Sequence, residues 1–216
     1  MKIYSLVAIT LLHGALMSVS ALTTQDRILK PNYQIEYTKI PGEVSTLGDM
    51  ITQGDVYGRI RSNALWWDWE NELYPATLDN SAWGLGGSIV YKTAFLNGFG
   101  ATVGFYGSIP LGGEDDNSKL GINYTKAGKD AFHTRADGSE GSIGVVAEGY
   151  GEYKSSQNDL KVGRQIIEST LLASNDGKMV PNTFEAAVFE TKLIPDTTAR
   201  IGYITPPTKH LNNQAA

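Results

Sequence analysis

Residues 159 to 203 read DLKVGRQIIESTLLASNDGKMVPNTFEAAVFETKLIPDTTARIGY, and this stretch contains three short runs in which apolar and polar side chains alternate. In the last run Ala199, Ile201 and Tyr203 are separated by single polar or small residues. A long polar loop and a tight Pro-Asp turn separate the three runs. Alternation with a period of two predicts strands of a sheet with one apolar and one polar face.

The first 21 residues, MKIYSLVAITLLHGALMSVSA, have the pattern of a secretory signal. Lys2 precedes an apolar run from Leu6 to Met17, and small residues end the segment at Ala21. A membrane-spanning helix does not fit, because the apolar run is shorter than the roughly 18 residues that such a helix needs. We therefore expect residues 1–21 to be a signal peptide and the chain to be exported.

The composition excludes several classes of protein. There is no cysteine, so disulfides and thiolate metal sites are ruled out, and the net charge of −5 argues against a nucleic-acid partner. Beyond the signal only His133 and His210 remain, too few for a histidine-dependent triad or metal cluster. We expect no enzymatic activity, no metal and no cofactor. The 24 glycines and 10% aromatic residues favour an all-β protein.

Seven runs with strand-like alternation follow a polar lead-in, and the Asn97-Gly98 pair after the second run is a strong hairpin signal. Short and long connections alternate between the runs, as they do in outer-membrane barrels with tight periplasmic turns and longer extracellular loops. The expected strands lie near residues 55–66, 83–95, 99–107, 143–153, 160–167, 183–192 and 197–205.

Aromatic residues gather at both ends of these runs, which favours a transmembrane barrel over a soluble β-sandwich. One group lies beside the first long loop and comprises Trp66, Trp67, Trp69, Tyr74 and Trp83; the other lies beside tight turns and comprises Phe95, Phe99 and Tyr153. The predicted fold is an antiparallel up-and-down transmembrane β-barrel, incomplete at about seven strands.

Charged residues of the strands share one face by parity. A basic side chain facing lipid at mid-depth costs about 2 to 4 kcal/mol, so this face should line the interior, where charge selects ions by sign. The expected pore-lining residues are Arg59, Arg61, Lys92, Glu148, Glu152, Lys161, Glu185 and Arg200, and Asp55 shares their parity. An alternative is that they only hydrate the interior. Arg164 shares parity with Leu160 and Val162 instead, and we expect it to lie beyond the apolar band.

Several segments resemble OprD-like outer-membrane porins, and more closely those of campylobacter-type bacteria. They are LKVGRQ, the loop SNDGKMVPNTFEA, the hairpin through IPDTTARIGY, and DVYGRIRSN after the lead-in. The resemblance covers residues 46 to 205, and its most specific part is the loop that contains Asn175-Asp176-Gly-Lys178.

The resemblance implies a barrel of about 18 strands that passes small charged solutes such as amino acids, peptides or carboxylates. In such porins the third extracellular loop folds inward beside a ladder of basic side chains. By motif, this loop is residues 168–182, with Asp176, Lys178 and Asn182 as constriction residues. Candidates for the ladder are Arg59, Arg61, Lys161 and Arg200.

An odd number of strands leaves an open edge, which lipid does not tolerate. Either the short run YQIEYTKI closes an eight-stranded barrel, or the chain is the N-terminal portion of a longer porin. We expect residues 22–52 to be a periplasmic lead-in, 53–205 the barrel portion and 206–216 a polar tail.

The expected location is the outer membrane. The expected partners are its lipid bilayer and small solutes, with a homotrimer for the full-length protein. The alternatives are a small eight-stranded surface or adhesion protein without a usable pore, and a soluble periplasmic sandwich.

Overall fold

The structure is a computed structural model. It describes residues 27–67, 80–112, 133–134, 140–169, 172, 174, 176–177 and 179–205. The expected signal peptide, the polar tail and Lys178 lie outside the described residues, as do the side chains of Trp67, Trp69 and Tyr74.

Seven long strands form an antiparallel meander, in which each strand pairs with the next along the chain. In chain order they are β4 (Asp55–Trp67), β5 (Asn80–Lys92), β7 (Phe99–Gly112), β10 (Ile143–Lys154), β11 (Asn158–Gln165), β12 (Phe184–Thr191) and β13 (Ala199–Ile204). Each coincides with one of the seven expected runs to within a few residues. Among the described residues β4 and β13 are the two edges of the sheet, so the barrel is open.

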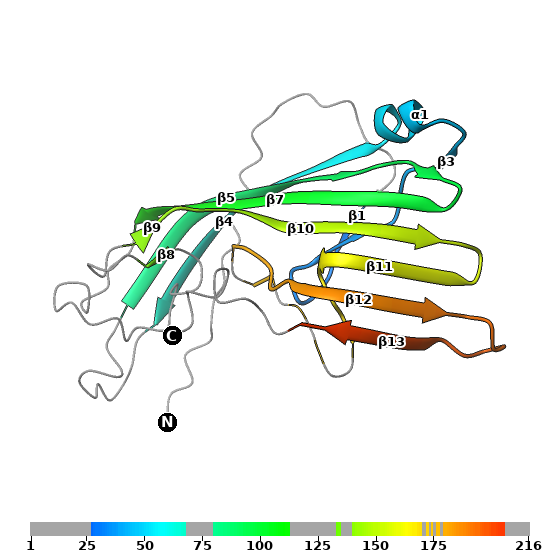
Figure 1. Cartoon of the computed structure of the whole chain (residues 1–216). Coiled ribbons are helices and arrows are strands. Elements are labelled where there is room, and N and C mark those ends of the chain that lie inside the picture. The colour runs from blue at the N-terminus through cyan, green and yellow to red at the C-terminus, as the bar shows by residue number, and fades with distance from the viewer. Residues whose placement is uncertain are drawn as a thin grey trace.

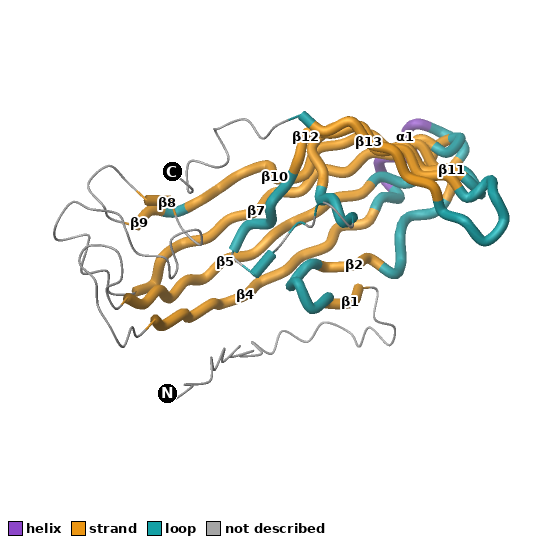
Figure 2. The backbone as a smooth tube through the Cα atoms, turned by 90° about the horizontal axis from the view of Figure 1, so that it is seen from below, coloured by secondary structure: helices purple, strands orange, loops and turns teal. Residues whose placement is uncertain are grey.

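The sheet is rolled into a trough, as Figures 1 and 2 show. The tight turns after β10 and after β12 lie together at the right of Figure 1, beside the short strands β3 (Glu43–Val44) and β6 (Phe95–Leu96) and the helix α1 (Leu47–Thr52). The β8 (His133–Thr134) and β9 (Glu140–Gly141) pair lies at the opposite end. No helix among the described residues is long and apolar enough to cross a membrane.

Side chains of the long strands are sorted between the two faces as their alternation predicts. On β4, Val56 and Ile60 point outward and Ile60 is 82% exposed, whereas Tyr57 between them is buried. Tyr57 packs in an inner cluster with residues of three other strands; the cluster comprises Tyr57, Val90, Tyr106 and Ala147. The outer face is therefore apolar and exposed, and the inner face holds the packed and charged groups.

A bulge in β10 breaks the expected alternation. Between Val146 and Glu148 the register of β10 against β7 shifts by one residue, so that Ala147 is the extra residue. Val145 therefore packs against the inner cluster, and Val146 is 48% exposed. Parity with Glu148 would have placed Val146 on the inner face and Val145 on the outer face. Glu148 and the residues that follow keep the faces that parity predicts. A bulge inverts the faces on one side of it only.

Phe95 is also placed differently from expectation. It lies in β6, which pairs with β3 and with β7, and its side chain is buried against Gly100 and not exposed on the outer face. The other described aromatic residues of the expected belts are exposed on the outer face: Trp66, Trp83, Phe99 and Tyr153.

The lead-in is more ordered than its sequence suggests. β1 (Arg27–Leu29) and β2 (Ile35–Tyr37) pair with each other and with no strand of the trough. The expectation that YQIEYTKI closes an eight-stranded barrel is therefore wrong for the described chain. Instead, the ring of Tyr37 lies 4.3 Å from that of Tyr57, which places this segment against the inner face (Figure 2).

The turn before β7 supplies a test of the fold. Asn97 and Gly98 both have positive φ, and a Cβ on Gly98 would lie 2.5 Å from the Lys154 carbonyl oxygen. We expect Gly98→Ala to destabilise the folded protein by about 1 to 2 kcal/mol, because an L side chain is strained there. The measurement is the urea midpoint followed by tryptophan fluorescence.

Gly151→Ala is the matched control, since no heavy atom lies within 4 Å of the Cβ it would add. Equal midpoints for the two variants would contradict the assignment of the turn.

Candidate functional site

The centre of the candidate site is a carboxylate held between two arginines. Arg59 and Arg61 lie two residues apart on the inner face of β4. Arg59 Nη1 donates to Asp176 Oδ2 at 2.6 Å, and Arg61 Nη2 donates to Asp176 Oδ1 at 2.6 Å. Arg61 Nη1 also donates to the backbone oxygen of Asp176 at 2.6 Å. Both oxygens of one buried carboxylate are thus paired with the wall.

The neighbouring residues of the loop follow the same wall. Asn63, the next inward residue of β4, donates from Nδ2 to the Gly177 oxygen at 3.0 Å. Met179 is 1% exposed and forms a buried cluster with Ala82 of β5. A Cβ on Gly86 would come within 3.0 Å of the Met179 Cε, so the absence of a side chain there allows this close approach. The loop between β11 and β12 is therefore folded into the trough.

A second arginine contact fixes the start of this loop. Arg200 on β13 donates from Nη1 to the Glu168 oxygen at 2.6 Å, and its Nε donates to Glu190 at 3.0 Å. The loop consequently touches both edge strands, β13 at Glu168 and β4 at Asp176.

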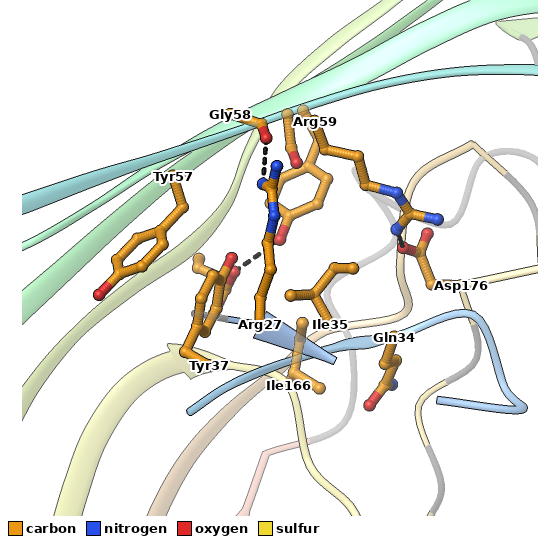
Figure 3. A pocket seen from close by; sticks show the side chains of 12 residues that line it. Arg27, Gln34, Ile35, Tyr37, Tyr57, Gly58, Arg59, Ile166 and Asp176 are labelled. Atoms are coloured by element: carbon orange, nitrogen blue, oxygen red, sulfur yellow. Dashed lines mark hydrogen bonds and ion pairs between the residues drawn. The ribbon is translucent and has the colours of Figure 1, made fainter. Parts of the chain in front are cut away.

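The lead-in supplies groups from the opposite side. Arg59 Nη1 also donates to the backbone oxygen of Tyr33 at 3.0 Å. The Asp176 amide donates to the backbone oxygen of Asn32 at 3.1 Å. Figure 3 shows Arg59 directed at Asp176, and Arg27 directed at the Gly58 carbonyl, to which it donates. Arg27, Arg59 and Asp176 are among the residues that line a small pocket of about 20 Å³.

The remaining inward charges form a separate cluster. Lys92 Nζ donates to the Tyr150 hydroxyl at 2.9 Å and to Thr102 Oγ1 at 3.3 Å. Lys161 Nζ lies 3.5 Å from Glu152, and the Tyr106 hydroxyl donates to Glu148 at 2.7 Å. Together with the lead-in these strands enclose a cavity of about 430 Å³ that holds charges of both signs.

Glu185 does not belong to the inner face, which corrects the expectation. It is directly opposite Arg164 in the register of β11 and β12, and Arg164 Nη2 lies 2.7 Å from it. Leu160 and Val162 share that face and are exposed. No register shift separates Arg164 from them, so the outer face carries one charge pair whose members neutralise each other.

The other expected site residues divide in two. Arg59, Arg61, Arg200 and Asp176 meet around the loop, and Lys92, Glu148, Glu152 and Lys161 meet around the larger cavity. Asn182 is exposed, and Lys178 lies outside the described residues. Within the described part of the chain no group of three or more acidic or histidine side chains could hold a metal ion.

Burial raises the pKa of the Asp176 carboxyl, and the charges of Arg61 and Arg59 oppose this shift. An uncompensated carboxylate in this place would be costly, so the two arginines are what permits its burial.

The Lys30–Glu168 contact joins the lead-in to the start of the loop. The hydrogen bond from Lys30 lowers the pKa of Glu168, and the same bond raises the pKa of Lys30.

Several residues of the site were missed from the sequence. Parity alone could have added Asn63, which shares the face of the two arginines. No sequence signal indicates Lys30, Asn32 or Glu168, because their contacts join segments more than 130 residues apart.

Taken together, an open antiparallel trough with an apolar outer face, a charged inner face and an inward-folded loop has the architecture of part of a porin-type β-barrel. Comparison with protein-family models gives no match, and neither does comparison with curated proteins. Two solved structures share the fold, and both are OprD-family outer-membrane porins.

The first is OccAB1 of Acinetobacter baumannii, with a TM-score of 0.55 and 21% identity over 72% of this chain. The second is OccK9 (OpdG) of Pseudomonas aeruginosa, with a TM-score of 0.52 and 20% identity, also over 72% of this chain. This chain spans 35% and 38% of their lengths. The predicted resemblance to OprD-like porins is confirmed at the level of the fold.

The Asp176 contacts predict the order of the loop. Replacing Asp176 by Ala leaves two arginines of the wall without their carboxylate, a loss that costs about 3 to 5 kcal/mol for a buried pair. We expect Asp176→Ala to release the loop and to raise the rate at which a protease cuts between residues 166 and 183 of the folded protein. Asn182→Ala, in the same loop but exposed, should be cut at the wild-type rate; equal rates for both variants would refute the docking.

The Lys30–Glu168 contact predicts a dependence on pH. Because the folded pKa of Glu168 is below its ordinary value of 4.5, the contact contributes stability above that pH and loses it as pH falls through the lowered pKa. A ¹³C titration of the Glu168 carboxyl should show a midpoint below 4.5 that rises in Lys30→Met. Lys192→Met, at a tight turn, should leave it unchanged. A midpoint insensitive to Lys30 would contradict the contact.

Proposed function

We propose that this chain forms part of the wall of an outer-membrane porin, through which small charged solutes cross by passive or facilitated diffusion. The observation that carries the proposal is the attachment of Asp176, on a loop folded into the trough, to Arg59 and Arg61 of the wall. A loop held inside a barrel narrows the passage at the point where the wall is charged.

The sorting of side chains supports a water-filled interior. Ile60, Ile89 and Val103 are exposed on the outer face, where a lipid bilayer would cover them. Placing Arg59 or Arg61 on that face would cost about 2 to 4 kcal/mol at mid-depth. The arrangement is that of a barrel with lipid outside and water inside, and not that of a sandwich with a dry core.

The balance of charge around the loop favours anions. Two guanidinium groups face one carboxylate at this point, which leaves one positive charge in excess. Charged rings in a pore select permeating ions by sign. Carboxylates, amino acids and peptides are the solutes that we propose, and the charges of both signs in the larger cavity suit molecules that carry both groups.

We place the protein in the outer membrane, with the lipid bilayer and small solutes as its partners. A homotrimer is the proposed assembly of the full-length protein. In this function the residues act by charge and by position, without covalent chemistry or a cofactor.

The test uses the protein as its gene encodes it, in planar bilayers under a salt gradient. We expect Arg59→Gln/Arg61→Gln to shift the reversal potential toward lower anion preference, because two positive charges leave the passage. Asp176→Asn should shift it in the opposite direction.

Lys192→Gln is the control for loss of a positive charge, since Lys192 is exposed at a tight turn. Unchanged potentials in the arginine variant would show that these side chains only hydrate the interior. Wild-type protein that folds in bilayers without conducting would refute the porin function itself.

A further inference from the structure

The lead-in segment of residues 27–40, which we name the internal arm, lies in the trough without belonging to its sheet. Among the described strands, its two short strands pair with each other alone, through three residue pairs. The arm therefore adds no hydrogen bond to the sheet's own ladders. It is attached to the wall and the loop at particular points, and each point can be examined by itself.

The first attachment is to the loop. Lys30 Nζ pairs with the Glu168 carboxylate, and Asn32 Nδ2 donates to Glu168 Oε1 at 2.6 Å. Asn32 Nδ2 also donates to the backbone oxygen of Ser174 at 3.3 Å, while the backbone oxygen of Asn32 accepts from the Asp176 amide at 3.1 Å. Asn32 alone thus contacts three described positions of the loop, including the residue that binds the arginines.

The second attachment is to the wall. The Tyr57 hydroxyl donates to the Lys39 oxygen at 2.8 Å, and the rings of Tyr37 and Tyr57 are 4.3 Å apart. The Lys92 ammonium lies 5.1 Å from the centre of the Tyr37 ring, within range of a cation–π contact. Arg59 of the wall belongs to this second attachment through its bond to the backbone oxygen of Tyr33, and it also donates to Asp176 of the loop.

The packing around Gln34 shows where the arm fits less completely. Gln34 is 4% exposed, and its Nε2 has no hydrogen-bond partner among the residues that the structure describes. A buried donor without a partner costs free energy. The arm is held by separate contacts, among them those of Lys30, Asn32 and Tyr37, and not by a fully satisfied interface along its length.

We propose that the internal arm determines the width of the permeation path, in that Lys30 and Asn32 hold the loop in its inward position and the arm itself occupies part of the trough. This inference rests on the proposed function for its effect on permeation. Lys30 and Asn32 are positioning residues: they act on solutes through the placement of Asp176. The arm is also one wall of the larger cavity, through Ile35, Tyr37 and Thr38.

The experiment has two readouts on the protein as its gene encodes it. Lys30→Met/Asn32→Ala removes the side-chain contacts of the arm with the loop. We expect hydrogen exchange of peptides that cover residues 165–177 to be at least about tenfold faster, since several hydrogen bonds are lost. Single-channel conductance in potassium chloride should rise, because the loop leaves the passage.

Two further variants control for folding and for position. Glu168→Gln weakens the same contact from the loop side while leaving the arm unchanged, and it should shift both readouts in the same direction. Leu29→Ala lies in the arm, but Leu29 is 58% exposed, and it should change neither readout. Heat-dependent migration in detergent gels shows which variants have folded.

Unchanged exchange in folded Lys30→Met/Asn32→Ala and Glu168→Gln overturns the proposal. Faster exchange with unchanged conductance also overturns it, since the arm would then hold the loop without affecting permeation. If the wild-type protein does not conduct, the porin function fails, and exchange alone decides whether the arm holds the loop.

Discussion

The structure depends on one buried carboxylate. Asp176 gives one oxygen to Arg59 and the other to Arg61, and it thereby joins a loop to a strand 115 or more residues away in sequence. Neither the acid nor the arginines could be buried without the other, because an unpaired charge inside a protein is costly. Since Arg200 binds the start of the same loop, this segment connects the first and last strands of the described sheet across the trough.

A second constraint is the division of the sheet into two faces. Apolar side chains cover the outside and charged ones the inside, which is what a barrel between lipid and water requires. The exception on the outer face, Arg164, is accompanied by Glu185, and the two neutralise each other. The bulge at Ala147 has a further consequence: it turns Val145 into the inner cluster while leaving Glu148 available to Tyr106.

The inner face is not a uniform lining. It has a compact cluster around Asp176 and a larger cavity around Lys92 and Lys161, and the internal arm lines both through Ile35 and Tyr37. The first holds the loop in place, and the second keeps space and charges of both signs. Part of the lead-in contacts both the loop and the wall, through Asn32 and through the backbone of Lys39.

The sequence by itself determined the seven strands, their up-and-down order and most of their inward residues, because these follow from local alternation and the lengths of connections. Alternation predicted the wrong face for a few residues whose placement depends on how neighbouring strands pair. A bulge exchanged the faces of Val145 and Val146, and pairing with Arg164 placed Glu185 outside. Only the tertiary structure decided that Asp176 binds two arginines and that Asn32 donates hydrogen bonds to Glu168 and Ser174 of the loop. Such contacts form because the rolled sheet brings segments that are far apart in sequence close together in space. Local periodicity in the sequence does not indicate which distant segments will meet.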